Sequence, residues 1–104
     1  MNALRLDRFQ VSEIEIENTL GALQNEVGGY IEVVMLSDKA AMIVNEEGLL
    51  LGLSPNVIAS AAAGTLIVGN ALIVGVDGED FTDVPFDIIN RIKKKLPEGS
   101  ISKI

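Results

Sequence analysis

The sequence predicts an α+β fold: a mostly antiparallel sheet with two to three helices packed on one side of it. Runs of β-branched and aromatic residues such as YIEVVML predict strands, whereas apolar residues at spacings of three and four predict helices. Turn residues such as NEEG, placed between the apolar runs, are typical of tight antiparallel connections. The chain has 104 residues, so we expect a single domain over residues 1–104 with one core.

The first third of the chain predicts a strand and then a helix. Residues 3–9 alternate loosely and predict an opening strand. Two interpretations compete for the next segment, because VSEIEIEN alternates like a strand while apolar spacings of four, three and four predict a helix over about 14–27. The helix is favoured for its second half, and residues 11–17 stay open between helix and strand. Gly28 and Gly29 end this helix, since glycine readily adopts the left-handed conformation of a C-cap.

The segment YIEVVML, residues 30–36, predicts a strand with two different faces. Alternation places one apolar set on the face that we expect to be the core: Ile31, Val33 and Met35. The other face is mixed: Tyr30, Glu32, Val34 and Leu36. Glu32 therefore either faces water or is partly covered by another element or subunit. A covered carboxylate needs a hydrogen-bonding or charged partner.

A hairpin and a short helix are predicted next. Residues 40–44 and 49–53 flank NEEG, whose Asn and Gly suit the first and fourth positions of a type I turn. In SPNVIASAAAG, Ser54 is expected to cap a helix that has Pro55 in its first turn and ends at Gly64.

The last third predicts β structure and a final helix. Residues 65–76, TLIVGNALIVGV, are predicted as β, with Gly69-Asn70 as either a tight hairpin turn or a bulge in one long strand. Helical spacing then relates Phe86, Ile89, Ile92, Lys93 and Leu96. Lysines in the last turn complement the helix dipole, and Pro97 ends the helix.

The composition excludes several classes of function. The chain has no cysteine and no histidine, so it lacks the thiolate nucleophile, the usual neutral-pH base and the commonest transition-metal ligand. The acids of VDGEDFTD, residues 76–83, do not have the spacing of an EF-hand loop. We therefore expect no metal and no cofactor. The formal charge of −7 argues against direct nucleic-acid binding, but it suits solubility, a basic partner or imitation of DNA.

One uncharged run, residues 57–76, is long enough to span a bilayer as a helix. It contains three glycines and Asn70, and acidic residues flank it in place of the Lys or Arg that orients a membrane span. The first residues, MNALRLDRF, contain no apolar run long enough for a secretion signal. We therefore expect a cytoplasmic protein with no membrane association.

A longer pattern joins several of these segments. The run LQNEVGGYIEVV, followed by VNEEGLLLGLSPNVIA and IVGNALIVG, resembles a family of small bacterial, plasmid and phage proteins classified only as a domain of unknown function. The matching positions, within about residues 19–76, are Leu23, Gln24, Val27 to Glu32, Glu46 to Gly48, Pro55, Asn56, Ala59 and Gly69. The resemblance implies a soluble cytoplasmic protein and an accessory role in a mobile element. It transfers no catalytic residue.

Binding is the leading hypothesis, because the sequence gives no two acids the fixed geometry that acid–base catalysis needs. We predict an accessory protein that is not an enzyme and binds itself, as a homo-oligomer, or another protein through a sheet surface with Tyr30 and Glu32. Residues 30–36 and 49–53 carry more apolar side chains than one small domain covers. Alternatives are a small-molecule binding or sequestering protein and an acidic inhibitor of a nucleic-acid enzyme. The candidate binding residues are Tyr30, Glu32, Asn45, Glu46, Asn56 and Asn70.

Overall fold

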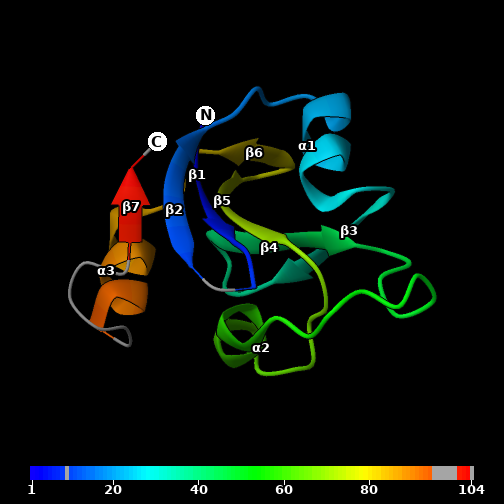
Figure 1. Cartoon of the computed structure of the whole chain (residues 1–104). Coiled ribbons are helices and arrows are strands. Elements are labelled where there is room, and N and C mark those ends of the chain that lie inside the picture. Colours follow the sequence, from blue (N-terminus) through cyan, green and yellow to red (C-terminus); the bar gives the residue numbers. More distant parts are fainter. Residues whose placement is uncertain (9, 95–100, 104) are drawn as a thin grey trace.

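A sheet with helices on both faces forms the core of the computed structural model, which describes residues 1–8, 10–94 and 101–103 (Figure 1). In chain order the elements are β1 (Asn2–Leu6), β2 (Val11–Glu15), α1 (Leu20–Val27), β3 (Ile31–Met35), β4 (Ala40–Asn45), α2 (Val57–Ala63), β5 (Ala71–Asp77), β6 (Asp80–Thr82), α3 (Phe86–Lys94) and β7 (Ile101–Lys103). The predicted α+β class is confirmed.

The sheet has the strand order β3-β4-β5-β1-β2-β7, and β6 pairs with the end of β5. Among the described strand pairs, β2 and β7 are parallel and the others are antiparallel. β3 therefore lies at one edge of the sheet, hydrogen-bonded to β4.

Helices cover both faces of the sheet, and the prediction of helices on one side was wrong. On one face, α1 contributes Leu23 and Val27 to a cluster with side chains of β4 and β5. On the other, α2 and α3 pack Ala59 and Ile89 against a second cluster. The cause lies in the central strands: every residue of β4 is buried, and its run Ala40 to Val44 is apolar without alternation, as in strands that are covered on both faces.

Residues 11–17, for which the sequence left helix and strand as alternatives, form mainly a strand. β2 ends at Glu15, and α1 begins only at Leu20, where the Thr19 hydroxyl accepts a hydrogen bond from Ala22 N at 3.2 Å. Gly28 has φ 81° and caps α1, which confirms the predicted end of this helix.

The hairpin predicted between residues 40–44 and 49–53 does not form. β4 does form, but β3 and β5 pair with its two edges, so no edge is left for residues 49–53. These residues instead make turns in which Leu51 N donates to Glu47 O at 2.9 Å and Leu53 N donates to Gly48 O at 3.0 Å.

The following segment begins later than predicted. Asn56, and not Ser54, is the N-cap of α2, because its side chain accepts a hydrogen bond from Ala59 N. Pro55 lies outside the helix and forms an isolated β-bridge with Val68. Gly64 caps the helix at φ 72°, as predicted.

Of the predicted strand 65–76, only the part from Ala71 onward forms, as β5. Gly69-Asn70 is neither a hairpin turn nor a bulge within a strand: it connects the bridged Val68 to β5, with Gly69 at φ 77°. The uncharged run 57–76 is thus divided between α2, this connection and β5. None of the helices in the described part of the chain has the length and apolar character needed to cross a bilayer.

The opening strand and the final helix are both present as β1 and α3. In α3 the buried side chains are Ile88, Ile89 and Ile92. Phe86 was predicted for the same face but is 73% exposed, because it is the first residue of the helix. The predicted Leu96 and Pro97 lie outside the described residues.

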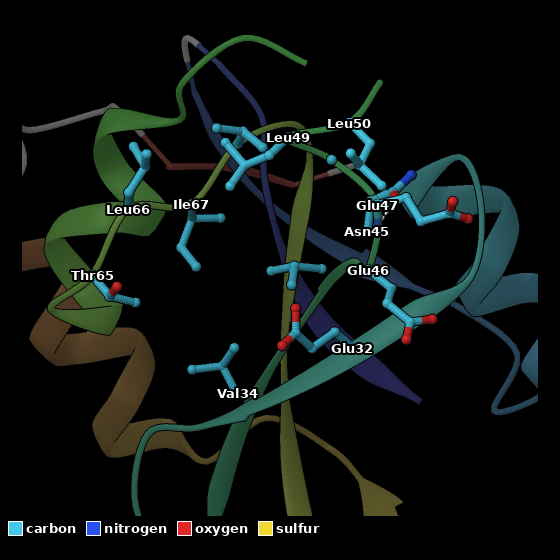
Figure 2. Close-up of a pocket in the computed structure, with 13 residues that line it drawn as sticks. Glu32, Val34, Asn45, Glu46, Glu47, Leu49, Leu50, Thr65, Leu66 and Ile67 are labelled. Carbon is cyan, nitrogen blue, oxygen red and sulfur yellow. Dashed lines mark hydrogen bonds between the residues drawn. The ribbon is translucent and has the colours of Figure 1, made fainter. Parts of the chain in front are cut away.

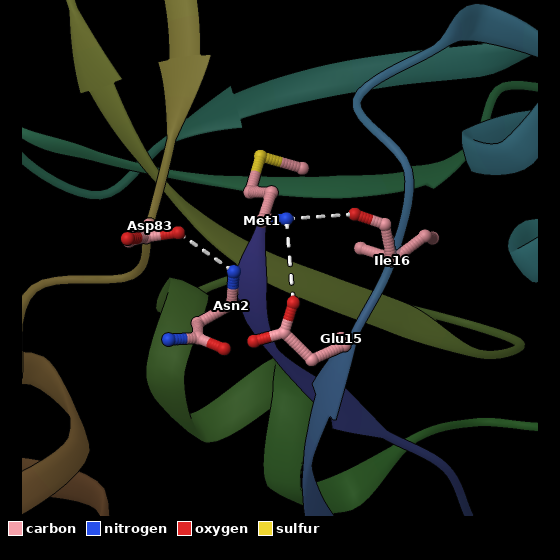
Figure 3. Close-up of polar contacts among 5 residues, drawn as sticks. All are labelled: Met1, Asn2, Glu15, Ile16 and Asp83. Carbon is pink, nitrogen blue, oxygen red and sulfur yellow. Dashed lines mark hydrogen bonds and ion pairs between the residues drawn. The ribbon is translucent and has the colours of Figure 1, made fainter.

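Polar contacts tie the start of β1 to two neighbouring segments (Figure 3). The Met1 amino group donates to Ile16 O at 3.0 Å and lies 3.7 Å from Glu15 Oε2, while Asn2 N donates to Asp83 Oδ1 at 2.7 Å. The Asp83 carboxylate thus accepts a bond within the fold. Over the described ranges, no three acidic side chains are grouped so that they could hold a metal ion.

Candidate functional site

β3 buries the opposite set of side chains from the predicted one. Val34 and Leu36 pack against the core on the α2–α3 face, whereas Val33 and Met35 are 42% and 54% exposed. Ile31 packs under α1, but this helix has eight residues and is only about 12 Å long. It covers the start of β3, and the prediction of an apolar core face was wrong beyond Ile31.

A groove of about 480 Å³ lies beside β3, on the face that carries Glu32 and Val34 (Figure 2). It runs between this strand, the turn after β4 and the segment that follows α2. The lining residues are Glu32, Val34, Val44, Asn45, Glu46, Glu47, Gly48, Leu49, Leu50, Thr65, Leu66, Ile67 and Val68.

Three leucines that line this groove are largely exposed to solvent: Leu49 is 73% exposed, Leu50 85% and Leu66 60%. The turn that carries the first two is packed closely against the opposite wall at Gly48. A Cβ added to Gly48 would lie 2.7 Å from Val68 Cγ2, so only glycine allows this contact without movement. The backbone of the groove is thus packed tightly while its leucines face outward.

Asn45 holds the turn in place from inside the protein. It is buried, its Nδ2 donates to Val27 O at 3.1 Å, and its Oδ1 accepts from Glu47 N at 2.8 Å. A Cβ on Gly29 would lie 3.0 Å from Asn45 Nδ2. The two glycines therefore have separate structural roles, since Gly28 caps α1 and Gly29 makes room for this amide.

The opposite wall is fixed by α2. Ile67 N donates to the Ser60 hydroxyl at 2.8 Å, and Ile67 O accepts from Asn56 N at 2.8 Å. The Asn56 side chain is buried and donates to the backbone carbonyls of Leu6 and Gly69, both at 2.9 Å. Its amide is fully engaged within the fold.

The charged residues among those that line the groove are all acidic: Glu32, Glu46 and Glu47. Figure 2 shows the Glu32 carboxylate pointing into the groove, whereas the carboxylates of Glu46 and Glu47 point away from it at the rim. The groove thus combines open apolar side chains with negative charge.

An ion pair elsewhere in the molecule supports the helix α1. Arg5 Nε donates to Glu26 Oε2 at 2.9 Å, and Arg5 Nη2 donates to Glu26 Oε1. Hydrogen bonding to the Glu26 carboxylate raises the pKa of Arg5 above its ordinary value. This pair connects β1 to α1 and offers no group for acid–base chemistry.

Comparison with protein families decides where the chain belongs. The family described as a domain of unknown function (DUF3846) matches residues 1–97. The chain belongs to this family. Neither the curated proteins nor the solved structures gave a match.

The structure of this DUF3846 domain brings three of the predicted site residues together, since Glu32, Asn45 and Glu46 line the same groove. Tyr30 is 65% exposed but lies outside that lining. Its carbonyl accepts a hydrogen bond from Glu46 N at 2.9 Å, which joins the start of β3 to the turn.

The pocket expected for a small molecule near the glycine pair, Asn45, Asn56 and Asn70 does not assemble from these residues. Asn70 and Gly28 line a separate cavity of about 360 Å³. Asn45 and Asn56 are absent from that lining, and their amides are bonded within the fold. The small-molecule alternative thus loses two of its three amides.

Sequence reasoning recognised residues 49–53 as apolar surface that one domain does not cover, but it did not bring Leu49 and Leu50 together with Leu66, because it assigned residues 49–53 and 65–68 to strands. A signal was present in the three consecutive leucines at 49–51, which have no period of two and so cannot present one apolar and one polar face as a strand.

Proposed function

We propose that this protein acts by binding and not by catalysis, and that it forms a homodimer through the outer edge of β3. We base the dimer on the outer edge of β3, which is open to pairing with another strand. Natural sheets normally protect an edge with Lys, Pro or a bulge, because open backbone groups pair with other strands. β3 has the sequence IEVVM, and its five residues pair one to one with residues 41–45.

The backbone pattern shows which groups face outward. Tyr30 O accepts from Glu46 N at 2.9 Å, and Leu36 N donates to Ala40 O at 3.0 Å. In an antiparallel pair only alternate residues bond to a given neighbour, so the even-numbered residues of this segment face β4. The N–H and C=O groups of the odd-numbered residues of β3 therefore point to the open edge, at positions 31, 33 and 35.

This edge is complementary to itself. Antiparallel pairing of two copies about Val33 places Ile31 opposite Met35 of the second copy and Glu32 opposite its Val34. No two carboxylates face each other in this register, so the like-charge repulsion that destabilises cross-strand pairs is avoided. The exposed apolar side chains of Val33 and Met35 become partly buried against the second copy. Because the two copies are related by a two-fold axis, the assembly is complete as a dimer.

The test is Val33→Pro. Because the Val33 N–H points outward, proline removes a donor from the open edge and leaves the ladder with β4 intact, as edge prolines do. We expect sedimentation velocity to show a dimer for the wild type at micromolar concentration and a monomer for Val33→Pro, with the same far-UV circular dichroism.

Val33→Thr is the matched control, since it keeps the β-branched shape and the N–H, and it should remain dimeric. A monomeric wild type at high micromolar concentration would overturn the dimer. A Val33→Pro protein that stays dimeric would overturn the assignment to β3.

The other parts of the functional proposal have different support. An accessory role in a plasmid or phage rests on the sequence resemblance alone, whereas a cytoplasmic location rests on that resemblance and on the lack of an apolar run long enough for a secretion signal in MNALRLDRF. The acidic-inhibitor alternative has less support from the shape, because extents of 34 × 29 × 25 Å describe a compact particle, whereas imitation of DNA calls for an extended row of carboxylates.

A further inference from the structure

We infer that the groove beside β3 is a docking site for a basic amphipathic peptide segment of another protein. Such a segment has Lys or Arg next to apolar side chains of the size of leucine. This inference rests on the binding part of the proposed function and is independent of the dimer, since the groove is complete within one chain.

The apolar half of the inference comes from the open leucines. Leu49, Leu50 and Leu66 are between 60% and 85% exposed and line one groove. Single exposed leucines are ordinary on a protein surface, whereas apolar side chains gathered at one place mark interaction sites. Their support is rigid, because Asn45 and Ser60 hold the backbone on the two sides of the groove by hydrogen bonds.

The charge of the groove selects the partner. Its charged lining residues are three glutamates, and the whole chain carries −7. Nucleic acids and anionic lipid surfaces are therefore repelled. Lys and Arg fit, because their aliphatic stems lie along apolar surface while the cationic ends reach a carboxylate. The Glu32 carboxylate points into the groove between Val34 and the turn that carries Leu49 and Leu50 (Figure 2). The cationic group of a Lys or Arg bound in the groove can reach this carboxylate there.

The position of the groove also relates it to the proposed dimer. Glu32 of one copy would face Val34 of the second copy on the same face of the joined sheet. Both residues line the groove, so the two grooves would meet across the two-fold axis. A dimer would thus present one longer surface to a partner, while a monomer would retain half of it.

Fluorescence anisotropy with a labelled synthetic peptide, LKKLLKLLKKLLKL, tests the site at physiological salt, where diffuse electrostatic attraction is screened. We expect saturable binding. Two control peptides separate the contributions: LEELLELLEELLEL keeps the leucines and reverses the charge, and SKKSSKSSKKSSKS keeps the charge and removes the leucines. Neither should bind measurably.

Matched variants then locate the binding. Leu50→Ser should weaken it about tenfold and Glu32→Gln about threefold, as expected for one buried leucine and one partly exposed ion pair. Phe86→Ser and Glu79→Gln alter exposed residues outside the groove and should leave peptide binding unchanged.

Three outcomes would overturn the docking site: no binding of the leucine–lysine peptide by the wild type, equal weakening by the remote pair of variants, or equally tight binding of the serine peptide. Val33→Pro separates the two proposals. Peptide binding by a monomeric Val33→Pro protein supports a groove that works without the dimer. A wild type that is monomeric yet binds the peptide refutes only the dimer, and a dimeric wild type that does not bind it refutes only the groove.

Discussion

Replacing Asn56 with alanine is expected to lower the free energy of unfolding by about 3 kcal/mol, the sum of a lost N-cap and of two lost side-chain hydrogen bonds to backbone carbonyls. Asn56 is 1% exposed. Its Oδ1 accepts from Ala59 N at 3.0 Å, and its Nδ2 donates to Leu6 O and Gly69 O. Through these hydrogen bonds, this side chain connects α2 to β1 and to the segment that precedes β5. Urea denaturation followed by circular dichroism measures the change.

Asn25→Ala is the matched control for this substitution, because Asn25 is an exposed residue of α1. We expect its effect to stay within about 0.5 kcal/mol, as for most surface substitutions. Asn56→Asp keeps the capping oxygen but turns a carboxylate toward two carbonyls, so it should also be strongly destabilised at pH 7. If Asn56→Ala cost no more than Asn25→Ala, the three hydrogen bonds would have no net stabilising effect.

The sequence predicted those elements whose signals are local. The glycine C-caps at Gly28 and Gly64 and the final helix with Ile89 and Ile92 are set by neighbouring residues, and the structure contains all of them. Three strands were predicted at nearly their observed positions for the same reason: β1, β3 and β4.

Non-local features escaped prediction. Residues 49–53 suited a hairpin with β4, but β3 and β5 occupy both edges of that strand, and no local pattern reveals this competition. The faces of β3 were reversed for a related reason. Alternation divides the side chains into two sets, but which set is covered depends on how far α1 reaches, and this helix covers only the start of β3.

In the candidate site, too, local features could be predicted from the sequence and non-local contacts could not. Glu32 and Glu46 were each named as candidates, one on a strand and one in a turn, but only the structure shows that both line the same groove. Asn45 and Asn56 were taken for ligand-binding amides, since polar residues near turns often bind ligands. In the structure their side-chain N–H groups donate to the backbone carbonyls of Val27 and Leu6, which are 18 and 50 residues away, and no spacing rule connects positions so far apart.

A larger effect still is expected from one methyl group in β5. Gly75 lies between Ala40 of β4 and Thr82 of β6. A Cβ at this position would lie 2.1 Å from Asp83 O and 2.9 Å from Thr82 Cγ2. The first neighbour is backbone, so rotation of a side chain gives no relief. Gly75→Ala should therefore lower the free energy of unfolding by more than about 3 kcal/mol, the upper end of ordinary overpacking.

Gly21→Ala provides the opposite control. Gly21 lies in α1, and a Cβ there has no neighbour within 4 Å. Alanine is favoured over glycine by about 0.5–1 kcal/mol in a helix interior, and in the first turn, where Gly21 lies, we expect a gain of the same sign. Urea denaturation of the two variants thus compares the same chemical change in a crowded strand and in an open helix. An upward shift of both midpoints would show that β6 moves away from β5 at little cost. In that case Asp83, which also accepts the hydrogen bond from Asn2 N, would not be held rigidly against the sheet.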